Sequence, residues 1–285
     1  MTTPNPIVHL PTTPVAFAKM NGAGNDFILI DNRRGMIGPE AAELARRVCH
    51  RRLGVGADGL ILIENSAAAD FSWRFFNCDG SLADMCGNGA RCAARFAHLN
   101  GITGVVMRFE TLAGMIQAEV RQDEVAIRIT PPKIVAVDMA LAVSGGTFKV
   151  DRIDTGVPHA VVFVDDPAAV DVVGLGRGIR FHSLFAPAGA NVNFAAVKAK
   201  GVLALRTYER GVEDETLACG TGATAAALAA ARRFGWASPV LVETASGRRL
   251  TISFAVDGDG FRDPWLQGDA RLACSGMLSP EAWND

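Results

Sequence analysis

Short runs of apolar residues dominate the chain, and most of them have the length and composition of β-strands. They are rich in Val, Ile, Leu and Phe, and β-branched and aromatic residues favour pleated sheet. Some alternate apolar with polar residues, as in 125–129, so one face of the sheet should meet a core. The predicted strands are 27–31, 60–64, 105–110 and 115–120 in the first half of the chain, and 160–164, 202–208, 240–244 and 250–254 in the second.

Patterns typical of helices are few. One covers 39–52, with a proline near its start and Gly54 just past its end. Two others follow Cys86 and Cys219. Their predicted caps are Asn88 and Thr221, and the glycines just past their ends are Gly101 and Gly235. Each half is therefore predicted to be a mostly antiparallel sheet with one main helix, an α+β arrangement.

The two halves carry one motif at a fixed offset. Cys86 begins Cys-Gly-Asn-Gly-Ala, and Cys219, 133 positions later, begins Cys-Gly-Thr-Gly-Ala. The same offset matches Glu, Thr and Gly further along without a gap, which favours duplication over a chance likeness of strand-helix-strand units. We predict two homologous halves, 15–135 and 147–275. The first 14 residues contain four prolines and should form a disordered extension.

Charge and composition exclude several functions. The formal charge of −2 gives no basic footprint for nucleic acid or an anionic membrane surface. No apolar run approaches the roughly 20 residues of a membrane-spanning helix. The N-terminus lacks the charged and apolar regions of a signal peptide, so we expect a cytoplasmic protein whose six cysteines are thiols.

A cysteine at the head of a helix has chemical consequences. The unpaired N–H groups and the dipole of the first turn stabilise a thiolate and can hold a carboxylate, and the nearby glycines let a ligand approach the backbone. If the halves pack about an approximate two-fold axis, two such helix starts meet at one cleft. One thiolate could then remove an α-proton while the opposing thiol protonates the other face, with no pyridoxal cofactor. A lone cysteine is usually a small buried hydrophobe, but the matched pair favours the racemase interpretation.

Polar residues gather near the same repeats. At the offset of 133, His159 matches Asp26 and Arg210 matches Asn77. A histidine, or Glu209 beside the arginine, can accept a thiol proton. Arg210 suits a second carboxylate, which it would bind bidentately. Cys92 lies six positions after Cys86, which is not a zinc spacing, so no metal is expected.

Long segments of the chain resemble the diaminopimelate epimerase family. They read NGAGNDFILIDN, FFNCDGSLADMCGNGARCAARF, DTGVPHAVVFVDD, GANVNF and YERGVEDETLACGTGA, and they lie in the family's order along nearly the whole chain. The resemblance implies two pseudo-symmetric domains, each a sheet wrapped as a half-open barrel around a central helix, with an active-site cleft between them. It also implies interconversion of LL- and meso-2,6-diaminopimelate, on the route to lysine and peptidoglycan precursors. It implies a reaction that needs neither pyridoxal phosphate nor a metal. It also implies a possible homodimer.

The resemblance also assigns residues. It makes Cys86 and Cys219 the acid/base pair, assisted by His159 and Glu209. Its substrate-binding residues are Asn25, Asn77, Gly87, Asn88, Asn191, Glu209, Arg210, Gly220 and Thr221. The chain departs from many members at Val157 and Gly59, where they carry Asn and Gln, so contacts to the distal end of the substrate should differ.

Two alternatives remain open. One is a related cysteine-pair racemase acting on proline, hydroxyproline or histidine, which Arg210 and the asparagines disfavour. The other is a thiol redox or binding module. A redox protein more often has a local Cys-x-x-Cys, which this chain lacks.

Overall fold

The computed structural model describes residues 10–144, 146–258 and 260–283 of the 285-residue chain. Most of the predicted N-terminal extension, residues 1–9, lies outside the described residues. The rest is packed, because Leu10 contacts a hydrophobic core and the Trp283 indole donates a 2.9 Å hydrogen bond to the Pro11 carbonyl. No helix in the described ranges is long and apolar enough to cross a bilayer.

The chain divides into two compact units. Unit 1 is Met1–Val125 with Ala270–Asp285, and unit 2 is Ala126–Asp269. This division differs from the predicted halves because strand pairing decides it. Of the residues between the two predicted halves, 136–143 belong to a strand of unit 2, and the last strand of the chain pairs with the first strand of unit 1.

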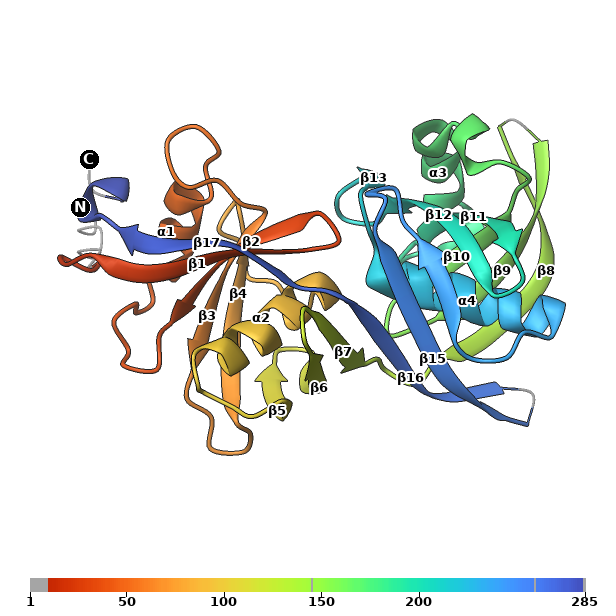
Figure 1. Cartoon of the computed structure of the whole chain (residues 1–285). Helices are drawn as coiled ribbons and strands as arrows, with labels where there is room; N and C mark the ends of the chain where they lie inside the picture. Colours follow the sequence, from red (N-terminus) through yellow and green to blue (C-terminus); the bar gives the residue numbers. More distant parts are fainter. Residues whose placement is uncertain (1–9, 145, 259, 284–285) are drawn as a thin grey trace. The chain divides into compact units, whose positions relative to one another are not determined.

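Unit 1 is a mostly antiparallel sheet with two helices (Figure 1). Its helices are α1 (Ala41–Val48) and α2 (Gly87–Leu99), followed near the C-terminus by the 3-10 turn η3 (Pro280–Ala282). Its strands are β1 (Val15–Gly22), β2 (Asn25–Asp31), β3 (Gly59–Glu64), β4 (Phe71–Asn77), β5 (Val106–Thr111), β6 (Gly114–Arg121) and β17 (Arg271–Leu278), and β7 (Glu124–Arg128) runs across the boundary to unit 2.

The strand β2 is buried on both faces. Ile28 and Ile30 belong to the core that packs against α1, with Leu44 of that helix. Phe27 points the other way, since successive strand residues face opposite sides, and its ring lies close to Gly89 at the start of α2. The helix α2 also contacts β1, β3 and β6, so the sheet curves around it. This explains why 27–31 is a continuous apolar run.

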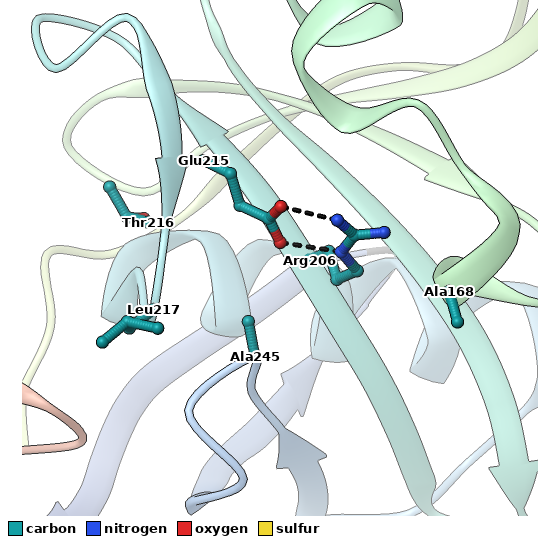
Figure 2. Close-up of a pocket in the computed structure, with 6 residues that line it drawn as sticks. All are labelled: Ala168, Arg206, Glu215, Thr216, Leu217 and Ala245. Atoms are coloured by element: carbon teal, nitrogen blue, oxygen red, sulfur yellow. Dashed lines mark hydrogen bonds and ion pairs between the residues drawn. The ribbon is translucent and has the colours of Figure 1, made fainter.

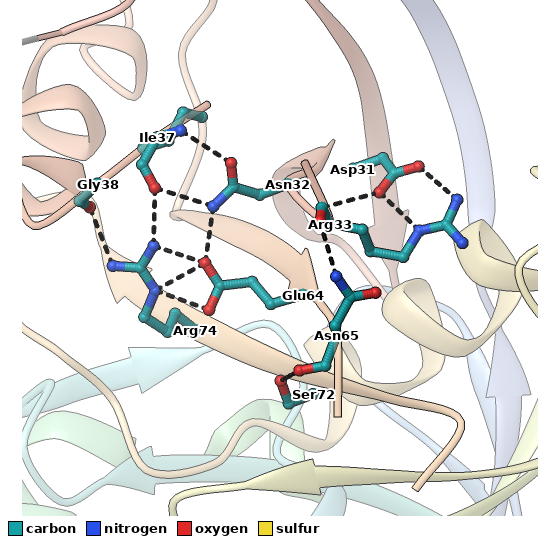
Figure 3. A network of polar contacts seen from close by, with 9 residues as sticks. All are labelled: Asp31, Asn32, Arg33, Ile37, Gly38, Glu64, Asn65, Ser72 and Arg74. Atoms are coloured by element: carbon teal, nitrogen blue, oxygen red, sulfur yellow. Dashed lines mark hydrogen bonds and ion pairs between the residues drawn. The ribbon is translucent and has the colours of Figure 1, made fainter. Parts of the chain in front are cut away.

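A polar network anchors the loop between β2 and α1 (Figure 3). Arg74 donates to both oxygens of Glu64, at 2.6 to 3.0 Å, and to the carbonyls of Ile37 and Gly38. The buried Asn32 donates to the same carboxylate at 2.7 Å and accepts from the Ile37 N–H at 2.8 Å. Charge-assisted pairing of this kind satisfies both ions, so the network holds the loop in place.

Unit 2 repeats the same plan with more strands. Its helices are α3 (Val172–Arg180) and α4 (Gly220–Phe234), with 3-10 turns η1 (Pro167–Ala169) and η2 (Ser183–Phe185). Its strands are β8 (Lys133–Val143), β9 (Gly146–Asp154), β10 (Pro158–Phe163), β11 (Asn191–Ala199), β12 (Val202–Glu209), β13 (Asp214–Thr216), β14 (Val240–Glu243), β15 (Arg249–Asp257) and β16 (Gly260–Asp269).

Most strand pairings of unit 1 have a counterpart in unit 2. The parallel pair β2–β3 matches β10–β11, and the parallel pair β4–β5 matches β12–β14. The antiparallel pairs β3–β4 and β5–β6 match β11–β12 and β14–β15. The outer strand is β17 in unit 1 and β8 in unit 2. Two pseudo-symmetric α+β units are therefore confirmed, and the outer strand comes from opposite ends of the two repeats.

The helix α4 is the central helix of unit 2. Eleven of its residues are buried, nine of them alanine or glycine, and it contacts strands from β9 to β16. Small side chains let a helix approach the surrounding strands closely, which accounts for its alanine-rich sequence. The helix α3 covers the opposite face, where Val172 and Ile179 pack with Phe194 and Tyr208.

Candidate active site

Cys86 and Cys219 are themselves the N-caps of α2 and α4. Both have extended backbones, and each sulfur accepts a hydrogen bond from the N–H three residues on, at 3.5 Å from Gly89 and 3.4 Å from Gly222. The predicted caps, Asn88 and Thr221, are therefore wrong. The helices begin one residue after each cysteine, so Asn88 and Thr221 stand inside the first turn, where a side chain no longer reaches the third amide.

The third helical residue is glycine in both motifs, and a Cβ there would be crowded to different degrees. A Cβ at Gly89 would lie 3.2 Å from the Ile61 side chain. A Cβ at Gly222 would lie 2.1 Å from Oδ1 of Asn193 and 3.3 Å from the Cys219 sulfur. The Cys-Gly-x-Gly pattern thus brings backbone amides, sulfur and a neighbouring strand together at each helix head.

Cys86 lies beside Asn25 and Asn88. Its thiol donates to Oδ1 of Asn25 at 3.5 Å, and Nδ2 of Asn88 donates to the same oxygen at 3.4 Å. The other end of the Asn25 amide donates to the Asp58 carboxylate at 2.5 Å. The strand β2 supplies Asn25 at its first residue, so the sheet edge and the helix head meet at the sulfur.

Cys219 has a different set of neighbours. It is 7% exposed, and its sulfur lies 3.5 Å from the hydroxyl oxygen of Thr221. The Thr221 carbonyl accepts from the Thr155 hydroxyl at 3.3 Å, which ties the helix head to the segment before β10. Gly220 is the first residue of α4, as Gly87 is the first of α2.

His159 is fully buried, and its hydrogen bonds define its tautomer. Burial, with the positive charge of Arg210, lowers the pKa of His159 to about 3, so the ring is neutral near pH 7. Asn193 accepts from the Thr207 hydroxyl through Oδ1, so its Nδ2 points to Nδ1 of His159, at 3.1 Å. The ring proton is therefore on Nε2, which has no hydrogen-bond partner among the described residues.

Asn191, Glu209 and Arg210 lie together at the ends of β11 and β12. The backbone N–H of Arg210 donates to Oδ1 of Asn191 at 2.9 Å, and the guanidinium reaches the Ala188 carbonyl at 3.5 Å. Burial raises the pKa of the Glu209 carboxyl above its ordinary value. Unit 2 thus contains an arginine, a carboxyl that holds its proton more strongly than usual and a neutral histidine on adjacent strands.

Asn77 pairs with Gly59 of β3, the residue after the Asp58 that binds Asn25. It ends β4, and its amide donates to the Ser81 hydroxyl at 2.9 Å. The structure brings together Asn25, Cys86, Gly87 and Asn88 in unit 1. In unit 2 it joins Cys219, Gly220 and Thr221 at the head of α4, and His159, Asn191, Glu209 and Arg210 along β10 to β12.

Sequence reasoning missed Asp58, Arg91 and Asn193. Asn193 was open to prediction, because it stands two residues after Asn191 on a strand and so shares its face. Arg91 lies in the motif after Cys86, where a fully buried arginine interrupts an apolar helix. Asp58 carries no local signal, because its contact with Asn25 joins residues 33 positions apart. Across the described residues, no group of three or more His, Cys, Asp or Glu side chains is placed to hold a metal ion.

A surface cavity of about 580 Å³ in unit 2 is lined by Arg206, Glu215 and four smaller side chains (Figure 2). Arg206 pairs bidentately with Glu215 at 2.6 and 2.7 Å and donates to the carbonyls of Pro167 and Val170. Four of the five guanidinium N–H groups thus bind protein acceptors, and the Glu215 carboxylate balances its charge, so the cavity offers a ligand little net charge.

Comparison with known proteins supports one family. The sequence model of the diaminopimelate epimerase family matches residues 17–135 and 152–261. A diaminopimelate epimerase of Aquifex aeolicus is 47% identical over 277 residues, covering 93% of this chain and 98% of that protein. One of a Hydrogenobaculum species is 44% identical, covering 92% and 98%. A crystal structure of a hydroxyproline epimerase from Agrobacterium vitis shares the fold, with a TM-score of 0.70 at 17% identity over 94% of this chain and 93% of that one. The chain belongs to the diaminopimelate epimerase family.

Proposed function

We propose that this protein interconverts LL- and meso-2,6-diaminopimelate by proton exchange at an α-carbon, with Cys86 and Cys219 as the acid/base pair. One observation carries the proposal: two repeat-equivalent cysteines each cap a helix, and each sulfur accepts a hydrogen bond from the backbone N–H of the third helical residue. Family membership supplies the substrate, because relatives that match nearly the whole chain bear that name.

The proposed reaction balances without a further reagent. One cysteine thiolate removes the α-proton, and the electron pair left on carbon moves into the carboxylate to give an enediolate. The other cysteine thiol protonates the opposite face of the carbon, so the two sulfurs exchange protonation states in each turnover. Amide N–H groups of the first helical turns are suited to stabilise the negative charge that develops on the carboxylate. The proposal requires that both sulfurs reach one α-carbon.

The residues of β10 to β12 are proposed to support this chemistry. His159 is neutral with its proton on Nε2, so it can donate a hydrogen bond without adding charge. Glu209 has a raised pKa, so it can exchange a proton with a thiol more readily than an exposed carboxyl. Arg210 is proposed to hold the distal carboxylate, together with Asn191 and Asn77. The substrate would also contact Asn25, Gly87, Asn88, Gly220 and Thr221.

Solvent isotope exchange tests the proposal. Pure LL-diaminopimelate incubated in deuterated water should become the meso form with deuterium at its α-carbon, and protein alkylated with iodoacetamide should not catalyse this. Exchange should also persist after treatment with a chelator and a carbonyl reagent, because the proposed chemistry uses neither metal nor pyridoxal phosphate. Labelling of proline or hydroxyproline in place of diaminopimelate would contradict the proposal and favour the related racemases.

The proposed setting is the cytoplasm, where thiols stay reduced. A homodimer is the proposed assembly, and light scattering at several protein concentrations tests it.

A further inference from the structure

A chain of directed hydrogen bonds passes beside the Cys86 thiol. Arg91 donates to Oδ1 of Asn88 at 2.9 Å, and Nδ2 of Asn88 donates to Oδ1 of Asn25 at 3.4 Å. Nδ2 of Asn25 then donates to Oδ2 of Asp58 at 2.5 Å. Arg51 donates to the other oxygen of Asp58 at 2.6 Å. Two amides thus lie head to tail between a buried guanidinium and a carboxylate.

The charged groups determine which way each amide points. A guanidinium only donates hydrogen bonds and a carboxylate only accepts them, whereas an amide can rotate to do either. Arg91 therefore holds the oxygen of Asn88 towards itself, and Asp58 holds the nitrogen of Asn25 towards itself. The consequence is that Asn25 presents oxygen, not nitrogen, to the sulfur of Cys86.

Asp58 is itself held firmly. Its Oδ2 also accepts from the backbone N–H of Asp26 at 3.1 Å, and its own N–H donates to Oδ1 of Asp26 at 3.0 Å. Arg51 bridges both carboxylates, and Lys19 pairs with Asp26 at 2.8 Å. Burial opposes ionisation of Asp26, but the hydrogen bonds from Arg51 and Lys19 outweigh it and lower its pKa to about 2. The cluster supporting Asp58 therefore keeps its shape near neutral pH.

The Asn25 oxygen beside the Cys86 sulfur favours the thiol over the thiolate. It accepts from S–H but repels a thiolate, whereas the N–H of Gly89 favours the thiolate. Beside Cys219, by contrast, the Thr221 hydroxyl and the Gly222 N–H can both donate to its sulfur. The cysteine better suited to rest as the anion is thus Cys219.

We propose that Asp58 is a positioning residue, which holds the Asn25 oxygen against Cys86 so that Cys86 rests as the thiol and serves first as the acid. The catalytic part of this inference rests on the proposed function, whereas the orientation of Asn25 does not. The charged groups near the thiol include those of the cluster and of the chain of hydrogen bonds (Lys19, Asp26, Arg51, Asp58 and Arg91), and Asp84 two residues before it in the chain.

Peptide-resolved alkylation of the full-length protein with iodoacetamide across pH measures the protonation of Cys86 directly. In Asp58→Ala the Asn25 amide loses its acceptor and can turn nitrogen towards the sulfur. The midpoint of Cys86 alkylation should fall by about one pH unit, which is about tenfold faster labelling below the midpoint. The exposed Cys274 serves as an internal reference that should keep its midpoint.

Two controls separate orientation from simple loss of charge. Asp84→Ala removes a carboxylate two residues before Cys86 without touching Asn25, and should move the midpoint much less. At about 0.5 M salt the long-range effect of a charge is screened, but a contact between amide and sulfur is not, so the Asp58→Ala shift should persist. A shift that disappears in salt, or one that Asp84→Ala reproduces, would overturn the proposal.

Exchanging the amide and the carboxylate between positions 25 and 58 should reverse the fall in the Cys86 midpoint. In Asn25→Asp with Asp58→Asn, the amide at position 58 can donate to the carboxylate at position 25, which still turns an oxygen to the sulfur. The Cys86 midpoint should return to the wild-type value or exceed it, and a purely structural role for Asp58 gives no such return. Because alkylation needs no turnover, a lowered midpoint in a protein inactive on diaminopimelate would refute the proposed function and leave the orientation standing. An unchanged Cys86 midpoint in an active Asp58→Ala enzyme would refute the orientation of Asn25 by Asp58 and leave the proposed function standing.

Discussion

The heads of α2 and α4 have the same backbone and different chemistry. In each, a cysteine caps the helix and its sulfur binds the third amide, at 3.5 Å in one and 3.4 Å in the other. Beside Cys86 stands the oxygen of Asn25, and beside Cys219 stands the hydroxyl of Thr221. Duplication preserved the geometry that polarises the thiol, and neighbouring side chains then diverged. Such a difference suits the proposed roles of the two residues as acid and base in the same turnover.

The largest expected effect comes from removing either sulfur. Cys86→Ala and Cys219→Ala should each lower epimerisation by at least about 10²- to 10⁴-fold, the contribution typical of a positioned acid or base. Conversion of LL- to meso-diaminopimelate, followed by chiral chromatography, measures the loss.

The matched control is Cys274→Ala, which removes an exposed thiol outside the site and should leave turnover unchanged. If either helix-cap variant retained more than a tenth of the wild-type rate, the two-thiol mechanism would be untenable.

Sequence alone revealed the duplication and the two thiols because both are local patterns. The Cys-Gly-x-Gly motif recurs at one offset, and the runs around Phe27 and Leu60 form strands where apolar residues predict them. The helix caps were misplaced, because assigning them required knowing the residue at which each helix begins.

Features that depend on contacts between residues far apart in the chain could not be predicted from the sequence. The helix α3 contains three glycines, which weaken a helix on its own, yet it forms because its apolar residues pack on β11 and β12. The strand β17 joins unit 1 by pairing with β1, some 250 residues earlier in the chain. The support of Asn25 by Asp58 is likewise a product of the fold, since β2 and β3 pair in parallel.

The two equivalent glycines should respond differently to a methyl group. Gly222→Ala forces a Cβ against Oδ1 of Asn193, so it should lower the free energy of unfolding by about 1 to 3 kcal/mol, as overpacking does. Gly89→Ala meets only a flexible end of Ile61, and the gain in helix propensity of about 0.5 to 1 kcal/mol offsets part of the strain. Urea unfolding of both variants measures the difference. Equal destabilisation would mean that Asn193 does not constrain the head of α4.

The buried His159 should make the stability of unit 2 depend on pH in the range between about 3 and 6.5. Its pKa is lowered from 6.5 to about 3, so below pH 6.5 the unfolded chain binds a proton that the folded protein does not. The contribution of the neutral His159 to the free energy of unfolding is fully present above pH 6.5. It is lost as the pH falls towards 3, at up to about 1.4 kcal/mol per pH unit. Between pH 7 and pH 5 the wild type should lose about 2 kcal/mol more than His159→Gln, as judged by urea unfolding at both values. A His159→Gln variant with the same pH dependence would show that His159 is not responsible.

The smallest effect we expect concerns the hydroxyl beside Cys219. Thr221→Val keeps the shape of the side chain and the backbone carbonyl that Thr155 binds, but removes the group 3.5 Å from the sulfur. Losing one donor should raise the midpoint of Cys219 alkylation by about half a pH unit and slow turnover a few-fold at pH 7. Thr221→Ser keeps the hydroxyl and should behave as the wild type. This shift runs opposite to the one expected at Cys86 when Asp58 is removed, since one variant takes a donor from a thiolate and the other takes an acceptor from a thiol. Two shifts of the same sign would mean that the helix heads are chemically equivalent and that the side chains around them do not assign the acid and the base.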